Sequence, residues 1–355
     1  MPGRARSPGR HGDRMRKPEA NRIMSILNTP ITVNGLQLKN RLVMPPMATA
    51  KSDPDGRAAQ QLLDYYDKKS KGGHIGLIII EHCYVNPAGK ASAGQLSASR
   101  REDLPGLRRL AEVIHGNGSK VILQISHAGS AASEKLTGLP VLGPSAVRNP
   151  RVSSCVPAAM TKDDLARVTD DFAAAALLAR DAGFDGVEIH SAHGYLLNQF
   201  YSPLTNRRTD EYGPASVESR LRLHLEIIAA VRAAVGPEYP LALRLGACDY
   251  ADGGSTLQDG AAAAGILEGA GIDLLDISGG CCGYLRPDAA GPGYFSDAAE
   301  AVRQAVRIPV ILTGGITKAE EAEALLAGGR ADLIGVGRAI LKDSAWAAHA
   351  VSALS

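Results

Sequence analysis

Eight short apolar segments, separated by longer segments with a helical pattern, constrain the fold of this chain more than any other feature. The apolar segments are rich in Ile, Leu and Val and span residues 42–44, 76–80, 121–125, 187–189, 241–245, 274–277, 310–312 and 333–336. The helical segments between them span residues 60–71, 104–117, 163–182, 216–235, 257–270, 296–306 and 319–328. Repeated strand and helix units predict a parallel sheet, and eight strands close into a barrel that side chains can fill. We therefore predict an α/β fold with a single (β/α)8 TIM barrel. An open doubly wound sheet is less favoured, because no G-x-G-x-x-G motif follows the first strand.

Two features precede the first predicted barrel strand. Residues 32–38 form two alternating segments around Asn34-Gly35, which predicts a β-hairpin that plugs the lower end of the barrel. Residues 1–24 carry seven Arg or Lys against two acidic residues and have no apolar core, so they cannot be a secretory signal. We expect these residues to be a disordered basic extension, with Met24 as a plausible native start. Residues 25–355 are then expected to form the barrel domain.

Composition narrows the class of protein. Hydrophobic residues make up 45% of the 355-residue chain and charged residues 21%, as in ordinary globular proteins. The sequence after Met24 is slightly acidic, which argues against a nucleic-acid partner, and no apolar run approaches the length of a membrane span. The five cysteines show no C-x-x-C spacing, so neither a disulfide framework nor a four-cysteine iron–sulfur site is indicated. We expect a cytoplasmic enzyme that acts on a small molecule, and a homo-oligomer is compatible with the sequence.

Polar side chains gather where the fourth predicted strand ends. His190, His193 and Tyr195 follow residues 187–189 directly, and parallel α/β folds keep their chemistry at this end of their strands. A polar stretch, residues 202–214, follows and is longer than a plain connection requires. Two histidines at a strand end are, by themselves, as compatible with a structural role as with a catalytic one. Metal binding is less favoured, because the sequence offers no obvious third ligand.

Glycines follow the last two predicted strands, as Thr313-Gly314-Gly315 and as Gly335-Val336-Gly337-Arg338. Glycine lets backbone N–H groups approach an anion, and barrels commonly bind phosphate after strands seven and eight. Arg338 could add a charge-assisted contact. This pattern predicts a phosphate site, but a phosphorylated substrate would fit it as well as a nucleotide cofactor does.

The longest motif is residues 186–220, GVEIHSAHGYLLNQFYSPLTNRRTDEYGPASVESR. It resembles the signature of the Old Yellow Enzyme family of NAD(P)H-dependent flavin oxidoreductases, in the branch with two histidines where the founding members have His and Asn. The resemblance runs from about Asn34 to Lys342. It implies FMN as the cofactor and NAD(P)H as the reductant. Because the chain ends soon after the eighth helix, the single-domain form is expected, with FMN as its only redox centre.

The resemblance also assigns residues to the cofactor. The residues expected to contact the flavin ring are Pro45, Pro46, Met47, Ala48, His82, Gln124 and Arg244, and those expected at its phosphate are Gly314, Gly315, Gly337 and Arg338. His82, expected just past the second strand, stands where the family usually has a small residue, and Ala48 stands where relatives have Thr or Cys. Arg244 could alternatively be neutralised by an ion pair with Glu81 or Glu188, because buried charges are normally paired.

For catalysis, the resemblance implies an ene-reductase. His190 and His193 would bind the carbonyl oxygen of an α,β-unsaturated substrate, and Tyr195 would donate the proton to its α carbon. His127, at another strand end, is at least as compatible with a structural role. Two alternatives stay open: a flavin-dependent dehydrogenase or NADH oxidase acting on another substrate, and a flavin-free barrel lyase or isomerase that binds a phosphate ester.

Overall fold

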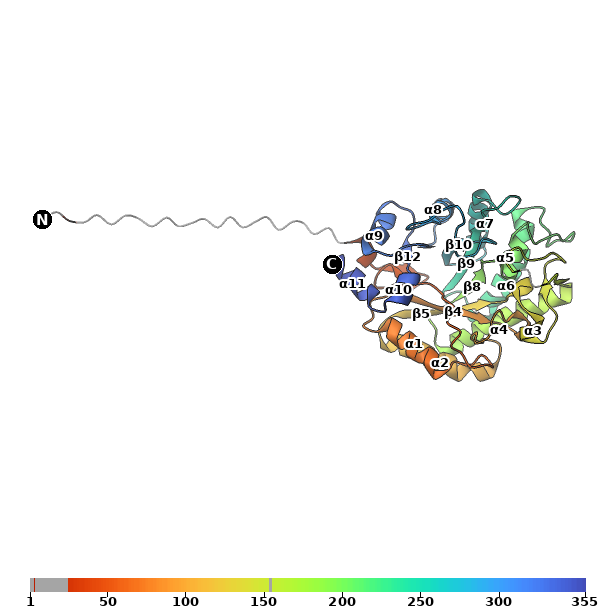
Figure 1. Cartoon of the computed structure of the whole chain (residues 1–355), viewed down its shortest axis with the longest axis horizontal. Coiled ribbons are helices and arrows are strands. Elements are labelled where there is room, and N and C mark those ends of the chain that lie inside the picture. Colours follow the sequence, from red (N-terminus) through yellow and green to blue (C-terminus); the bar gives the residue numbers. More distant parts are fainter. Residues whose placement is uncertain (1–2, 4–24, 153–154) are drawn as a thin grey trace.

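A closed barrel of eight parallel strands, surrounded by helices, forms the body of the computed structural model (Figure 1), in which residues 3, 25–152 and 155–355 are described. The predicted TIM barrel is therefore confirmed. The strands, in their order around the barrel, are β10 (Leu274–Gly279), β11 (Val310–Thr313), β12 (Leu333–Gly335), β3 (Leu42–Met44), β4 (Leu77–Tyr84), β5 (Lys120–Ser126), β8 (Gly186–Ser191) and β9 (Leu241–Cys248). Apart from Gly3, the predicted basic extension lies outside the described residues.

The helices pack around the barrel in the predicted order. They are α1 (Gln60–Ser70), α2 (Leu104–Gly116), α4 (Lys162–Ala182), α6 (Val217–Val235), α7 (Leu257–Gly269), α8 (Ser296–Ala305) and α9 (Ala319–Ala327), and the chain ends with α10 (Arg338–Lys342) and α11 (Trp346–Ala353). At the start of α4, the Thr161 side chain accepts a hydrogen bond from the Asp164 backbone N–H, and the Asp164 carboxylate bonds back to Thr161. The ends of these seven helices lie within a residue of the prediction, and α6 and α7 begin with reciprocal side-chain caps of the same kind as α4.

Two local predictions differ from the structure. His82 does not lie past the second barrel strand but within β4, which continues through a register irregularity between Ile80 and Cys83. The polar pair Glu81-His82 interrupts the apolar run there, so the sequence pattern ended too early. A short helix, α5 (Leu196–Tyr201), also follows Tyr195 and was not predicted, because six residues are too few to show a helical period.

The predicted hairpin covers the lower end of the barrel. Its strands β1 (Ile31–Val33) and β2 (Leu36–Leu38) pair antiparallel, and Asn34 and Gly35 both have positive φ angles, 41° and 77°, as a two-residue hairpin turn of this type requires. Val33 and Leu38 are buried against one layer of barrel side chains, from Leu77, Ile79, Ile122, Ala242, Leu274, Ile311 and Leu333. Among the described residues, the hairpin thus covers one end of the barrel and leaves the opposite end open for a site built from these strands.

Contacts between distant parts of the sequence close the barrel. Strands β3 and β12 share only two paired positions, a narrow junction, and Lys69 of α1 joins the first helix to the end of α10. The buried Lys69 ammonium donates to the carbonyls of Ile340 (2.7 Å) and Leu341 (2.9 Å) and to the Ser344 hydroxyl (2.9 Å). These carbonyls belong to the end of α10, where a helix leaves its acceptors unpaired.

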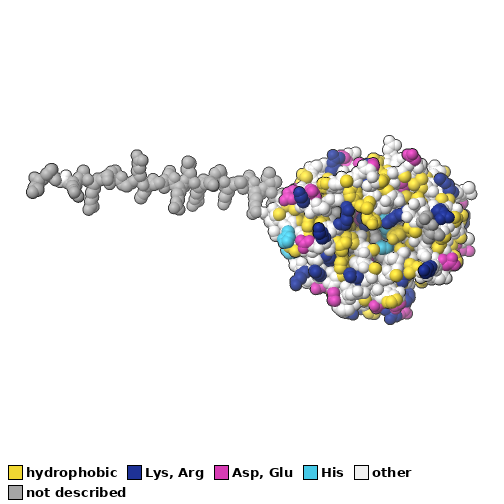
Figure 2. Space-filling view, viewed as in Figure 1, with side chains coloured by type: hydrophobic (Ala, Val, Ile, Leu, Met, Phe, Trp, Pro, Cys, Tyr) yellow, Lys and Arg dark blue, Asp and Glu magenta, His cyan; other side chains and the backbone are white. Residues whose placement is uncertain are grey.

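The face of the molecule seen in Figure 2 and the described helices bear on the predicted absence of a basic face and of a membrane span. Lys and Arg side chains are interspersed with Asp and Glu on the face seen in Figure 2. None of the described helices combines the length and the apolar character needed to cross a bilayer. Cys83, Cys248, Cys281 and Cys282 form no disulfide in the described structure.

Candidate active site

A pocket of about 450 Å³ opens at the C-terminal end of the barrel strands. Its lining includes every residue to which the sequence analysis assigned a role: Pro45, Pro46, Met47, Ala48, His82, Gln124, His190, His193, Tyr195, Arg244, Gly314, Gly315, Gly337 and Arg338. It also includes residues that sequence reasoning missed, among them Arg151, Tyr284, Tyr294 and Leu341. These residues lie outside the barrel strands, and the sequence pattern there does not indicate which side chains face the pocket.

His190, His193 and Tyr195 form one compact group in this pocket. The ring centroid of His190 lies 5.2 Å from that of His193 and 5.1 Å from that of Tyr195, both edge to face. The Tyr195 hydroxyl lies 3.4 Å from Nε2 of His82, whose ring comes in from β4. Four side chains capable of hydrogen bonding therefore converge on one part of the pocket.

A strained turn produces this convergence. His193 has a φ of 60° and Gly194 a φ of 69°, a left-handed conformation that is uncommon for any residue other than glycine. The His193 backbone N–H donates to the Gly279 carbonyl (3.1 Å), and the His193 Nε2 lies 2.7 Å from the Ser278 hydroxyl, so β10 fixes both the backbone and the ring. Strain of this kind persists only where the surroundings over-determine it, and it is concentrated at functional sites.

Buried amides support the turn from below. The Asn198 side chain accepts from the Gly194 N–H (2.8 Å), and Gln199 and Asn149 both donate to the Gly194 carbonyl (2.7 and 2.9 Å). His127 belongs to this supporting layer, because its Nδ1 accepts from the Gly129 N–H (3.0 Å) and its ring does not line the described pocket. The geometry favours the structural alternative for His127.

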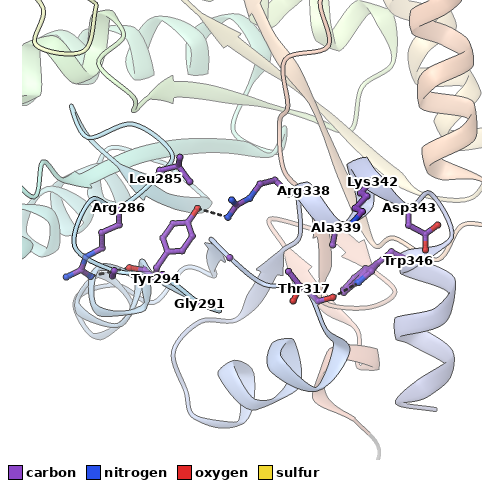
Figure 3. Close-up of a pocket in the computed structure, with 13 residues that line it drawn as sticks. Leu285, Arg286, Gly291, Tyr294, Thr317, Arg338, Ala339, Lys342, Asp343 and Trp346 are labelled. Atoms are coloured by element: carbon purple, nitrogen blue, oxygen red, sulfur yellow. Dashed lines mark hydrogen bonds between the residues drawn. The ribbon is translucent and has the colours of Figure 1, made fainter.

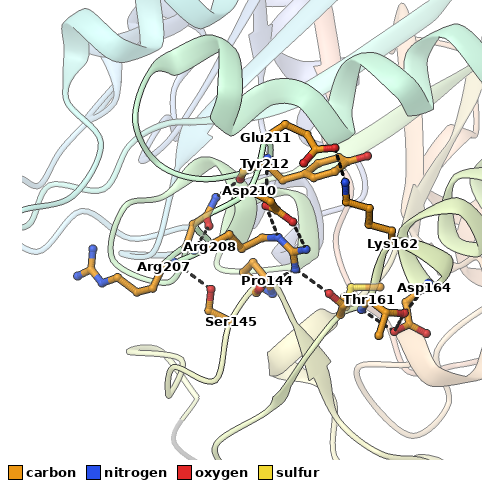
Figure 4. A network of polar contacts seen from close by, with 12 residues as sticks. Pro144, Ser145, Thr161, Lys162, Asp164, Arg207, Arg208, Asp210, Glu211 and Tyr212 are labelled. Atoms are coloured by element: carbon orange, nitrogen blue, oxygen red, sulfur yellow. Dashed lines mark hydrogen bonds and ion pairs between the residues drawn. The ribbon is translucent and has the colours of Figure 1, made fainter.

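The long polar loop holds a neighbouring segment in place. Arg208 forms an ion pair with Asp210 and donates to the carbonyls of Pro144 (3.0 Å) and Met160 (2.7 Å), as Figure 4 shows. The Arg207 backbone N–H donates to the Ser145 hydroxyl (2.9 Å). Both ends of the segment that carries Arg151 are therefore tied to this loop. Residues 202–214 contribute nothing to the described pocket lining, so their part in the site is indirect.

Burial keeps the pocket imidazoles neutral. Burial, together with the positive charges of Arg244 and Arg151 and the neighbouring imidazoles, lowers the pKa of His190 and of His193 well below the ordinary value. Burial likewise lowers the pKa of His82 to about 4. The pKa of Tyr195 is raised by burial, against the opposing effect of Arg151. At neutral pH the site therefore presents uncharged N–H donors and a protonated phenol.

Burial also lowers the pKa of His224, which lies outside the pocket, and this predicts that the stability of the protein depends on pH. His224 is fully buried beside the Ser191 hydroxyl (2.8 Å), and burial lowers its pKa from 6.5 to about 3. Between pH 6.5 and 3 the unfolded chain binds a proton at His224 that the folded chain does not bind. The contribution of His224 to the free energy of unfolding is therefore complete above pH 6.5 and is lost as the pH falls toward 3. We expect His224→Gln to flatten the pH dependence of the free energy of unfolding by roughly 1 kcal/mol per pH unit between pH 6 and 4. Denaturant titrations at several pH values measure this slope, and identical slopes in the two proteins would contradict the assignment.

Beneath the histidines lies a fully buried polar cluster. Gln124 donates to Glu188 Oε1 (2.7 Å), and the Arg244 Nε lies 3.1 Å from Asp276 Oδ2. Arg244 therefore pairs with neither Glu81 nor Glu188, the two partners considered from the sequence. The strand register places Asp276 of β10 directly opposite Arg244 of β9, and this register cannot be read from the sequence.

Some polar atoms of this buried cluster have no hydrogen-bond partner in the described chain. Glu188 Oε2 and His190 Nδ1 are buried and make no hydrogen bond within the described chain, whereas Arg244 Nε and Asp276 Oδ2 face each other as an ion pair. Burial raises the pKa of Glu188 well above its ordinary value, with a further contribution from Asp276, and burial also raises the pKa of Asp276. Unsatisfied buried groups of this kind are expected where a polar ligand completes the site.

The opposite side of the pocket is a glycine cradle. At Gly315, with a φ of 67°, a Cβ would lie 1.9 Å from the Gly291 carbonyl oxygen, and at Gly335 it would lie 2.0 Å from the Thr313 hydroxyl. The Arg338 guanidinium is exposed here, 3.4 Å from the Tyr294 hydroxyl. The cradle continues outward into a second cavity of about 860 Å³, which is lined by Tyr294, Arg338, Lys342 and Trp346 among others (Figure 3). A slot with unsatisfied polar groups at one end and a glycine cradle with a free arginine at the other fits an FMN.

No group of three His, Cys, Asp or Glu side chains that could hold a metal ion occurs in the described residues. The pocket is lined by amide, imidazole, phenol and guanidinium groups.

Comparisons with known proteins agree with this chemistry. A family model described as "NADH:flavin oxidoreductase / NADH oxidase family" matches residues 26–355. The chain is similar to the NADPH dehydrogenase of Bacillus subtilis, with 38% identity over 330 residues that cover 93% of this chain and 95% of the relative. It is 41% identical over 320 residues to the NADH oxidase of Thermoanaerobacter brockii, covering 88% of this chain and 49% of that protein. The chain therefore spans about half the length of this relative.

Two solved structures are also similar. Morphinone reductase in complex with tetrahydroNAD superposes with a TM-score of 0.80 at 27% sequence identity, over 93% of this chain and 91% of that one. The 2-naphthoyl-CoA reductase complex superposes with a TM-score of 0.87 at 28% identity, over 92% of this chain and 52% of that one. Both similarities extend over the whole barrel.

Proposed function

Because the chain belongs to the NADH:flavin oxidoreductase / NADH oxidase family, we propose that it is an FMN-dependent NAD(P)H oxidoreductase that reduces the activated C=C bond of an α,β-unsaturated carbonyl compound. Proteins of this family use FMN, with NAD(P)H as the reductant. Membership disfavours the flavin-free lyase or isomerase alternative. The observation that carries the choice of substrate is the group formed by His190, His193 and Tyr195, which faces one part of the pocket with neutral donors.

The cofactor is proposed to lie between the polar cluster and the glycine cradle. Gln124 and Arg244 would meet the polar edge of the ring, where a donor and a cation stabilise negative charge, and the backbone of Pro45, Pro46, Met47 and Ala48 would line one face, with His82 near the ring. Gly314, Gly315, Gly337 and Arg338 would hold the phosphate, since a glycine backbone and a forked cation suit an anion. Residues 25–355 would then form one FMN-binding domain.

The protein groups have separate roles in the proposed reaction. When bound, FMN supplies hydride transfer, taking a hydride from NAD(P)H and delivering one to the β carbon of the substrate. His190 and His193 donate hydrogen bonds to the substrate carbonyl oxygen and stabilise the negative charge that develops there. Tyr195 donates its hydroxyl proton to the α carbon. The surrounding apolar and aromatic side chains exclude water, which strengthens these hydrogen bonds.

One specific observation favours a second candidate, a flavin-dependent NADH oxidase: the similarity to the NADH oxidase of Thermoanaerobacter brockii. In that case dioxygen would take the electrons, and the histidine pair would have no carbonyl to bind. A flavin-dependent dehydrogenase would use the same pocket in the opposite direction. The two half-reactions distinguish these possibilities.

We expect the purified protein to be yellow, to lose its flavin absorbance on anaerobic addition of NADH or NADPH, and to regain it when cyclohexenone is added without oxygen. Anaerobic stopped-flow spectroscopy measures both steps. Recovery of absorbance with oxygen but with no enone would support the oxidase instead. A protein that remains colourless after incubation with FMN would overturn the proposal.

A further inference from the structure

Arg151 stands at the mouth of the pocket, above the histidines. Its Nη1 donates to the His193 carbonyl (2.5 Å), and its guanidinium carbon lies 5.6 Å from the centre of the Tyr284 ring. Its backbone N–H donates to the Asn149 side chain (3.0 Å). The guanidinium is thus attached to the same turn that carries the histidine pair, although Arg151 is an exposed residue.

The charge of Arg151 is not neutralised by the protein. Of the three arginines that line the pocket, Arg244 has Asp276 beside it, and Arg338 faces the glycine cradle at the other end. Arg151 makes no ion pair with a carboxylate in the described residues. Its positive charge contributes to the lowered pKa values of His82, His190 and His193. The charge therefore acts on the site where a substrate carbonyl would lie.

The segment that carries Arg151 is anchored rather than free. Arg208 ties both of its ends to the loop after α5 through the carbonyls of Pro144 and Met160. Asn149 is buried and holds both the Gly194 carbonyl and the backbone of Arg151. Within the described residues, Nη2 and Nε of Arg151 make no hydrogen bond. An arginine placed by such contacts is arranged to receive an acceptor with two oxygens.

We propose that Arg151 is a specificity residue that binds an anionic group of the ligand, and that the substrates are α,β-unsaturated carbonyl compounds bearing a carboxylate. This inference rests on the proposed function, because it takes His190 and His193 as the carbonyl site. Since Arg151 is bonded to the main chain of His193, its guanidinium can reach an anionic group of the same small molecule whose ketone oxygen is bound by His190 and His193, as in a small cyclic keto acid. A phosphate of NAD(P)H shares the same chemistry, and the experiment separates the two sources.

The test compares 4-oxocyclohex-2-ene-1-carboxylate with its methyl ester, a pair that differs in the anionic group. We expect wild-type protein to prefer the acid, and Arg151→Met to lower the ratio of kcat/KM for acid over ester by about 10-fold to 100-fold. Arg151→Lys should restore part of the preference, because it retains the charge. Arg207→Met is the matched control, since it removes an exposed arginine that is not among the residues lining the described pocket.

A binding measurement supplements the kinetics. The saturated 4-oxocyclohexane-1-carboxylate does not react, and its Kd for the oxidised flavoprotein follows from the change in flavin absorbance on titration. Arg151→Met should weaken this binding by a similar factor, while the Kd for NADH and NADPH in the reductive half-reaction stays unchanged. An unchanged acid-to-ester ratio overturns the proposal, as does a loss confined to NADH and NADPH, which would assign Arg151 to the reductant.

The results that would contradict the proposed function differ from those that would contradict the role of Arg151. If wild-type protein reduces neither the ester nor cyclohexenone, the ene-reductase assignment fails, whereas weaker binding of the saturated acid by Arg151→Met would still show an anion site. If the variant loses acid and ester equally, Arg151 has only a structural effect on the His193 turn, and the specificity role is overturned.

Discussion

Replacement of Tyr195 by phenylalanine is expected to slow reoxidation of the reduced flavin by cyclohexenone by about 10²-fold to 10⁴-fold, the range typical of a lost general acid. The phenol is mostly buried, and its raised pKa keeps it protonated at neutral pH. Its hydroxyl lies 3.4 Å from His82 Nε2 and makes no other hydrogen bond in the described structure. Phenylalanine keeps the ring packing against His190, so the change removes the proton and little else. Stopped-flow traces of reoxidation measure the effect.

Reduction by NADH is the internal control, because that step needs no proton from Tyr195, and its rate should change by less than a few fold. Tyr284→Phe is the matched variant, since Tyr284 also lines the pocket but is 55% exposed at its rim. Equal losses in the two half-reactions of Tyr195→Phe would remove its role as proton donor.

Gly315→Ala is expected to weaken FMN binding on the order of 100-fold, so that the protein is purified largely without cofactor. The residue has a left-handed backbone, and the added Cβ would lie 1.9 Å from the Gly291 carbonyl oxygen and 2.8 Å from its carbon. Backbone atoms cannot rotate away as a side chain can, so one wall of the proposed phosphate cradle must move. Fluorescence titration of the apoprotein with FMN gives the Kd.

Gly329→Ala separates the clash from the backbone strain. Gly329 has nearly the same φ, 68° against 67°, but the nearest atom to its added Cβ would be the end of the Arg303 side chain at 3.9 Å. This control should lose about 1 to 2 kcal/mol of stability through its left-handed backbone and keep its affinity for FMN. If both variants bind FMN as the wild type does, the cradle does not hold the phosphate.

The barrel could be predicted from the sequence because buried parallel strands are continuous apolar runs, and each run was visible. The same rule predicts that His190, His193 and Tyr195 lie at one end of the barrel, where the structure has them. The extension of β4 through His82 was missed because polar residues that face a ligand site look like the end of a strand. The helix α5 was missed because it is too short to show a period.

The ion-pair partner of Arg244 and the loop residue Arg151 could not be predicted from the sequence. Asp276 neutralises Arg244 because β9 and β10 pair in one register, and a shift of one residue would have turned Asp276 away. Arg151 reaches the pocket because Arg208 and Asn149 anchor its segment, and these contacts join residues far apart in the sequence. Such tertiary contacts leave no periodic signal.

The narrow junction between β3 and β12 has a consequence for assembly. Pro45 and Met47 follow the first barrel strand, Gly337 follows the last, and a Cβ on Gly337 would lie 3.2 Å from the Met47 sulfur. The two walls of the slot therefore come from the first and the last strand of the barrel, and they meet only where β3 and β12 pair. A nascent or truncated chain has no slot to offer, so uptake of the yellow cofactor marks a barrel that is already complete.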